Sequence, residues 1–143
     1  MAFGLIIFTL LLICGTTMGH VSFTTAQIAK LAGTVLLGVF PFASMGILLA
    51  CVVPPNAAIG FVNLIYLPMS FLSGLWFPID GLPHWIRVLA PIWPTWHLGQ
   101  LAIHDIGFPM QWSVMGHVIW LICFSIACLG LALVLFRRSA QKA

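Results

Sequence analysis

Four long apolar stretches dominate the sequence, at about residues 2–19, 31–53, 57–77 and 113–136. A helix crosses the hydrocarbon core of a bilayer with about 20 mainly apolar residues, and the first stretch meets this length least well. Apolar residues make up 62% of the chain and charged residues 5%, so polar side chains are too few to cover a water-soluble globule. The sequence therefore predicts an all-α integral membrane protein, a single transmembrane domain with four transmembrane helices.

The second and third stretches are separated only by "VPPN", whose prolines end one helix and allow a tight turn into the next. These two helices should form an antiparallel hairpin. After the last stretch, "RRSAQKA" places Arg137, Arg138 and Lys142 next to the membrane, where an excess of positive charge marks the cytoplasmic side. The expected protein is multi-pass, with a cytoplasmic C-terminus and an external segment at 78–112.

The segment at about 78–104 is apolar, yet proline and tryptophan interrupt it repeatedly. Between the prolines, apolar residues recur at helical spacing in two short pieces, and Thr95 is the expected cap of the second piece. Indole rings favour the level of the lipid headgroups. We expect an external re-entrant or interfacial helical hairpin before the last span; an ordinary external loop with tryptophan anchors is the alternative. The residues expected to shape the hairpin are Pro78, Asp80, Pro83, Trp85, Arg87, Pro91 and Pro94.

Asp80 and Arg87 are the charged residues of this hairpin. They are two helical turns apart, so a salt bridge requires Asp80 to bend back over the first short helix. Contacts with lipid headgroups are the alternative for both side chains.

Small and polar residues in the third span form a second candidate set, for a substrate pathway or for helix packing. Ser70, Ser73 and Gly74 lie near its outer end, next to Phe71. Small side chains let helices in a bilayer approach closely. Asn63 lies in the middle of the span, where an amide without a partner is costly, so it should face another helix or a polar cavity.

Several kinds of chemistry are not expected of this chain. It contains no G-x-x-x-x-G-K-[ST] loop for ATP phosphates, and none of the four spans contains the carboxylate that a proton-coupled exporter needs. Its cysteines show no C-x-x-C spacing, and it lacks the clustered basic face of a nucleic-acid-binding protein. His97 and His104 are too far apart along a helix to bind one metal ion. We therefore expect no enzymatic activity, cofactor, metal ion or nucleic-acid partner.

Within residues 41–101, "FASMG", "LPMSFLSGLWFP" and "LPHWIRVLAPIWP" resemble the C-terminal half of ABC-2 type transporter permeases. The resemblance implies a six-span exporter subunit of the bacterial inner (plasma) membrane, of which this chain carries the C-terminal part. It also implies a homodimer in the lipid bilayer that passes a hydrophobic or amphipathic substrate outward, with energy from a separate ATP-binding subunit. The family's cytoplasmic loop between the second and third spans, a main contact for the ATPase, is not represented in these residues.

Two alternatives to the permease remain at this point. One is a small four-span structural or interaction protein of the membrane. The other is an intramembrane serine protease that pairs Ser73 with His117 as its base. In that class a glycine stands two residues before the serine, and Phe71 stands there in this chain.

Overall fold

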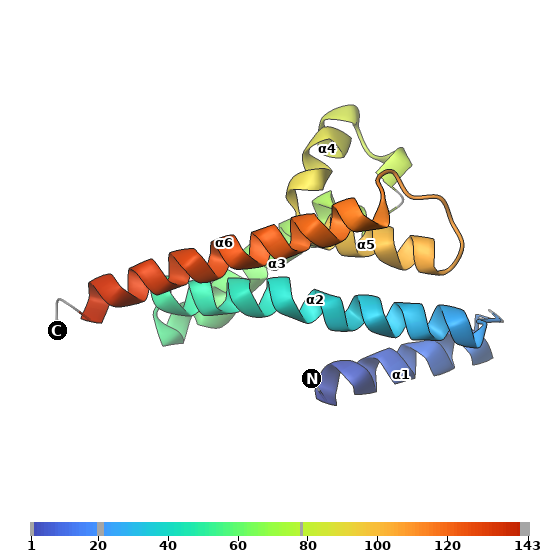
Figure 1. The fold of residues 1–143 in the computed structure, drawn as a ribbon, viewed down its shortest axis with the longest axis horizontal. Coiled ribbons are helices and arrows are strands. Elements are labelled where there is room, and N and C mark those ends of the chain that lie inside the picture. Colours follow the sequence, from blue (N-terminus) through green and yellow to red (C-terminus); the bar gives the residue numbers. More distant parts are fainter. Residues whose placement is uncertain (1, 20–21, 78, 141–143) are drawn as a thin grey trace.

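The computed structural model describes residues 2–19, 22–77 and 79–140, and all regular structure in these residues is helical (Figure 1). This confirms the predicted all-α membrane fold. The longer helices are α1 (Ala2–Thr17), α2 (Thr25–Val52), α3 (Ala58–Leu72), α4 (His84–Leu89), α5 (Pro94–Asp105) and α6 (Val114–Ala140). Three short 3-10 helices connect them: η1 (Pro55–Ala57), η2 (Ile79–Gly81) and η3 (Ala90–Ile92).

In the part that the structure describes, three helical segments are long and apolar enough to cross a bilayer. They are Thr25–Val52, Pro55–Leu72 and Val114–Arg138. The predicted first span is a shorter apolar helix, α1, of 16 residues. At a rise of 1.5 Å per residue it is about 24 Å long, against a hydrocarbon thickness of about 30 Å.

Helices α2 and α6 lie side by side along most of their length and form the spine of the molecule (Figure 1). On α6, Leu121, Ser125, Cys128 and Ala132 are buried in a stripe at helical spacing. Three of these four side chains are small, which lets the two backbones approach closely without a hydrophobic driving force between them. The Ser125 hydroxyl donates to the Leu121 carbonyl at 2.8 Å, so its polar group is satisfied within its own helix.

The ends of the long helices have clear local causes. Helix α2 begins with a capping box, in which Thr24 and Gln27 each satisfy the backbone N–H of the other. Helix α3 ends at Leu72, before the predicted end at 77, because Gly74 adopts φ +80°. The N–H of Leu75 then reaches the carbonyl of Ser70 at 3.3 Å, which closes a Schellman turn.

The segment after α3 forms two short helices, α4 and α5, neither of which is long enough to cross a membrane. Helix α5 packs against both α2 and α6, while α4 lies to one side of them (Figure 1). Helix α5 begins at Pro94 with Trp93 as its cap, so the expectation that Thr95 caps it is wrong. The Thr95 hydroxyl instead donates to the carbonyl of Met69 in α3 at 3.3 Å. A tertiary contact has thus replaced a local one.

Candidate functional site beneath the short helices

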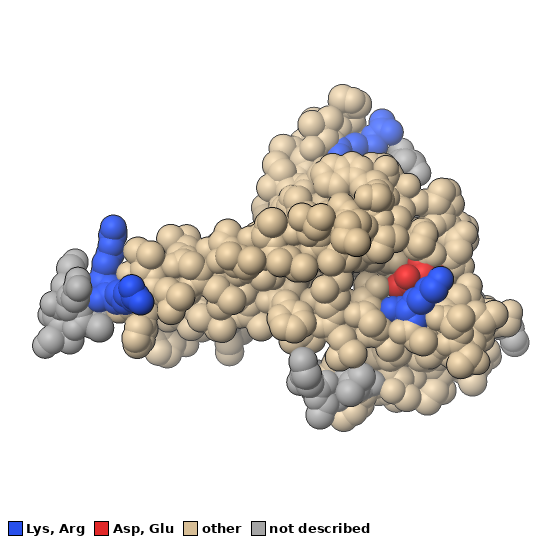
Figure 2. Space-filling model, in the orientation of Figure 1, with Lys and Arg blue, Asp and Glu red and all other residues tan. Residues whose placement is uncertain are grey.

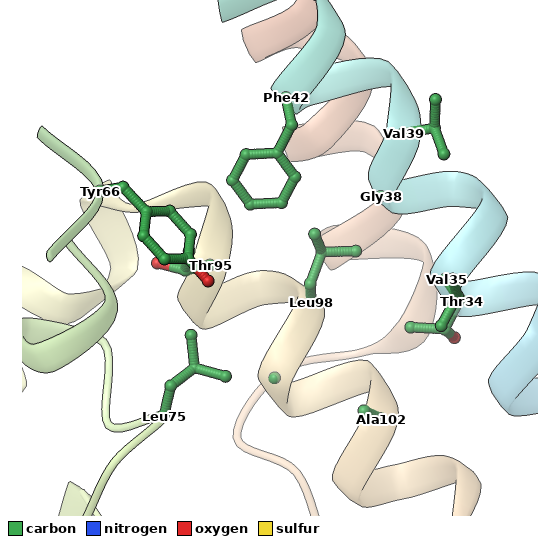
Figure 3. Close-up of a pocket in the computed structure, with 11 residues that line it drawn as sticks. Thr34, Val35, Gly38, Val39, Phe42, Tyr66, Leu75, Thr95, Leu98 and Ala102 are labelled. Carbon is green, nitrogen blue, oxygen red and sulfur yellow. The ribbon is translucent and has the colours of Figure 1, made fainter. Parts of the chain in front are cut away.

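A cavity of about 460 Å³ lies between α2, α3 and α5 (Figure 3). We call it the hairpin cavity. Most of its wall is apolar, and Figure 3 shows Phe42, Leu98 and Leu75 around it. Tyr66 and Thr95 add two hydroxyl groups to the lining. It is lined by Thr34, Val35, Gly38, Val39, Phe42, Tyr66, Leu75, Thr95, Leu98, Gly99 and Ala102. A volume of this size with few polar groups is typical of a site for an apolar molecule or for the apolar part of one.

A second, smaller cavity of about 250 Å³ also borders α5 and has three of the same lining residues, Leu75, Gly99 and Ala102. Two of the small residues singled out in the sequence, Ser73 and Gly74, line this smaller cavity. The Ser73 hydroxyl donates to the Ser70 carbonyl at 3.0 Å, so it helps to close the end of α3.

The remaining candidates of the third span lie elsewhere. The Ser70 hydroxyl donates to the Leu67 carbonyl at 2.9 Å and accepts a bond from the Trp76 indole at 3.1 Å. Phe71 is exposed and makes an edge contact with Phe77. Asn63 is exposed on α3 and lines neither cavity. A pathway role for these residues stays a prediction.

The residues expected to shape the hairpin take distinct positions. Pro83 precedes the first turn of α4, whereas Trp85 and Arg87 are exposed on that helix. Pro91 lies in η3, and Pro94 is the buried first residue of α5. Pro78 and the side chain of Asp80 lie outside the described residues, and with them the predicted Asp80 to Arg87 salt bridge.

Two buried histidines join α5 to α6. The Nδ1 atoms of His97 and His117 are 2.9 Å apart, and the Nε2 atom of His97 lies 2.9 Å from the carbonyl oxygen of Pro91. Since a carbonyl only accepts, His97 carries its hydrogen on Nε2, and its Nδ1 accepts the hydrogen of His117 Nδ1. The Nε2 atom of His117 is buried and has no partner among the described residues.

Tryptophan rings surround this histidine pair. His97 stacks on Trp120 with ring centroids 4.1 Å apart, and Trp112 stacks on His117 at 5.8 Å. Trp96 makes an edge contact with His97 at 4.9 Å. Burial among these rings lowers the pKa of His97 from 6.5 to about 4, because the imidazolium would lose its hydration. His97 is therefore neutral near pH 7.

The histidine pair has a structural role. In the described part of the chain, no three His, Cys, Asp or Glu side chains gather as a metal site requires. The hydroxyl of Ser73 and the Nδ1 atom of His117 bond to other partners, Ser70 and His97, so no Ser–His hydrogen bond of a protease is formed. The histidines hold the short helix α5 against the long helix α6.

This pair could not be predicted from the sequence because the two histidines are 20 residues apart and lie on different helices. The only signal in the sequence is the tryptophan near each of them, and it does not indicate which histidines meet.

Polar groups gather at one end of the hairpin cavity. The Thr34 hydroxyl donates to the Asp105 carboxylate at 2.6 Å, which joins the wall of the cavity to the end of α5. The Gln27 amide donates to the carbonyl of Ile106 at 3.1 Å. Lys30 is one helical turn before Thr34 on α2, so the two lie on the same face of that helix. Figure 2 shows acidic and basic side chains next to each other over α2 and α5.

The described residues form an all-helical membrane fold with three segments long enough to cross a bilayer and an apolar cavity next to the short helix α5. Residues 1–104 match the family model of the ABC-2 type transporter, and the chain belongs to this family. The family is that of a transmembrane component, which is not itself catalytic. This confirms the resemblance found in the sequence.

A relative from Bacillus subtilis (strain 168), named as the transport permease YvfS, is 26% identical over 68 residues. The match covers 48% of this chain and 28% of the relative, so the chain spans less than a third of the relative's length. No solved structure matches the chain. The comparisons support a transport permease of the membrane.

Proposed function

We propose that the chain is part of the membrane permease of an ABC exporter, which moves an apolar or amphipathic molecule outward across the membrane. The observation that carries this proposal is the hairpin cavity, which is large, mainly apolar and bounded by two long helices and α5. The energy comes from ATP hydrolysed on a separate ATP-binding subunit, as the family implies. Two copies of the permease form the working unit.

The orientation follows from charge. Arg137 and Arg138 are exposed in the last turn of α6, and this end of α6 is at the opposite end of the molecule from the short helices (Figure 1). The rule that positive charge stays inside supports a cytoplasmic position for this end in a bacterial cell, with the short helices at the outer face of the inner membrane. The hairpin cavity then lies in the outer half of the bilayer.

In this proposal the hairpin is a cap over the outer end of the substrate path. Helix α5 is fixed to α6 by the histidine pair. Its polar link to α3 is weaker, a single 3.3 Å bond from Thr95 to the carbonyl of Met69. The cavity therefore opens most easily by separation of α3 from α5, with α5 and α6 moving together.

The experiment is ATP-dependent transport by the complete permease, reconstituted in lipid vesicles with its ATP-binding subunit. A lipophilic dye and an acyl-labelled fluorescent lipid serve as probes, and ADP in place of ATP is the control. We expect ATP-dependent movement of at least one probe, and its loss when residues 82–91 are deleted. If the ATPase does not associate with the permease, a structural role in the membrane replaces the exporter. Unchanged transport after the deletion would overturn the capping role alone.

A further inference from the structure

Helix α2 has a basic side chain, Lys30, next to the polar end of the hairpin cavity. Lys30 is exposed and forms no hydrogen bond or ion pair with any described residue. Asp105, at the end of α5, is half-buried; one carboxylate oxygen accepts from Thr34, and no described residue donates to the other. The rim of the cavity therefore presents one free positive group and one half-satisfied negative group.

The cavity and these two charges are aligned along α2. From Thr34 to Phe42, which both line the cavity, the helix rises about 12 Å, and from Lys30 to Phe42 about 18 Å. The hydrocarbon layer of one leaflet is about 15 Å thick. If Lys30 lies at the headgroup level, the apolar cavity begins just below it and reaches through most of one leaflet.

From this arrangement we propose that the hairpin cavity binds a zwitterionic aminophospholipid, with part of one acyl chain in the cavity, the phosphate at Lys30 and the primary ammonium at Asp105. This inference deepens the proposed function and rests on it, because it names the substrate class of the same cavity. A purely anionic headgroup would meet the repulsion of Asp105, and a purely cationic one that of Lys30. A zwitterion satisfies both groups.

The headgroup should be ethanolamine rather than choline. A primary ammonium donates hydrogen bonds to a carboxylate, and charge-assisted bonds of this kind are the stronger ones. A quaternary ammonium has no hydrogen to donate. Asp105 should therefore distinguish between two lipids with the same net charge.

Gly99 offers a direct way to fill the cavity. It lines both cavities, and a Cβ atom at this position would meet no heavy atom within 4 Å. Gly99→Leu should place a side chain in the space assigned to the acyl chain without displacing a neighbour. Gly46→Leu on α2 is the matched control, because its Cβ atom also meets open space and it lines neither cavity.

The test is native mass spectrometry of the purified full-length chain in detergent, titrated with phosphatidylethanolamine, phosphatidylcholine or phosphatidylglycerol of identical acyl chains. We expect phosphatidylethanolamine to bind about fivefold more tightly than either other lipid. Gly99→Leu should remove this saturable binding, and Gly46→Leu should leave it intact. Asp105→Asn, which keeps an acceptor for Thr34, should remove the preference over phosphatidylcholine.

Three results would overturn the inference: no lipid preference in the wild type, equal binding by the two leucine variants, or an unchanged preference in Asp105→Asn. Circular dichroism and thermal unfolding of each variant show whether it keeps the fold. The assay contains no ATPase, so it is independent of transport. Binding without ATP-driven movement would refute the proposed function alone, and transport without selective binding would refute this inference alone.

Discussion

Acidification should destabilise the protein through His97. Burial lowers the pKa of this side chain to about 4 in the fold, against 6.5 when it is exposed. Between these two pH values His97 binds a proton in the unfolded chain but not in the folded chain. The contribution of His97 to the free energy of unfolding is therefore fully present above pH 6.5 and decreases as the pH falls toward 4. For one such group, the loss between pH 7.5 and pH 5 is about 2 kcal/mol.

His97→Gln isolates this contribution. The glutamine amide can still donate to the carbonyl of Pro91, but it does not titrate. Reversible unfolding in mixed detergent micelles, followed by tryptophan fluorescence, should report on the region directly because Trp96 and Trp120 contact His97. The wild type should lose about 2 kcal/mol more than the variant over this pH range. His117 faces His97 from α6 in the wild type and is present in both proteins.

Either of two results would refute this role of His97. One is a wild-type stability that does not change between pH 7.5 and pH 5. The other is an identical decrease in His97→Gln, which would place the titrating group elsewhere.

Two further predictions concern helix ends, both measured as the free energy of unfolding in the same micelles. Thr24→Ala removes the capping box of α2 and should lower the free energy of unfolding by about 1 kcal/mol. The control Thr25→Ala loses no described side-chain bond and should lower it less, so equal losses would contradict the capping role. Gly74→Ala should lower the free energy of unfolding by about 1–2 kcal/mol, because φ is +80° and the new Cβ lies 3.1 Å from Ile79 Cβ. The control Gly46→Ala, whose Cβ meets open space, should not destabilise the protein, and a fully stable Gly74→Ala protein would show that the turn does not require glycine.

The long helices could be predicted from the sequence because each one follows from an apolar run long enough for a bilayer. The turn at "VPPN" was also predictable, because a proline ends a helix through its own backbone geometry and needs no distant contact to do so. The two short helices followed from helical spacing between prolines. These features depend on residues that are neighbours in the chain.

The parts that could not be predicted depend on tertiary contacts. The bond from Thr34 to Asp105 joins residues 71 positions apart, and the histidine pair joins α5 to α6. Threonine is a residue type that often caps a helix, yet the Thr95 hydroxyl donates to the carbonyl of Met69 because α5 packs against α3. The hairpin cavity exists only where three helices meet, so no local pattern indicates its lining.

The central claim is that the short helices lie at the outer face of the membrane and the end of α6 at the cytoplasmic face. Arg87 and Arg138 are both exposed, so each can be replaced by cysteine in a background that lacks the four native cysteines. In intact cells, a membrane-impermeant maleimide should label Arg87→Cys at once and Arg138→Cys only after the cells are permeabilised. Labelling of Arg138→Cys in intact cells, or protection of Arg87→Cys until permeabilisation, would contradict the account.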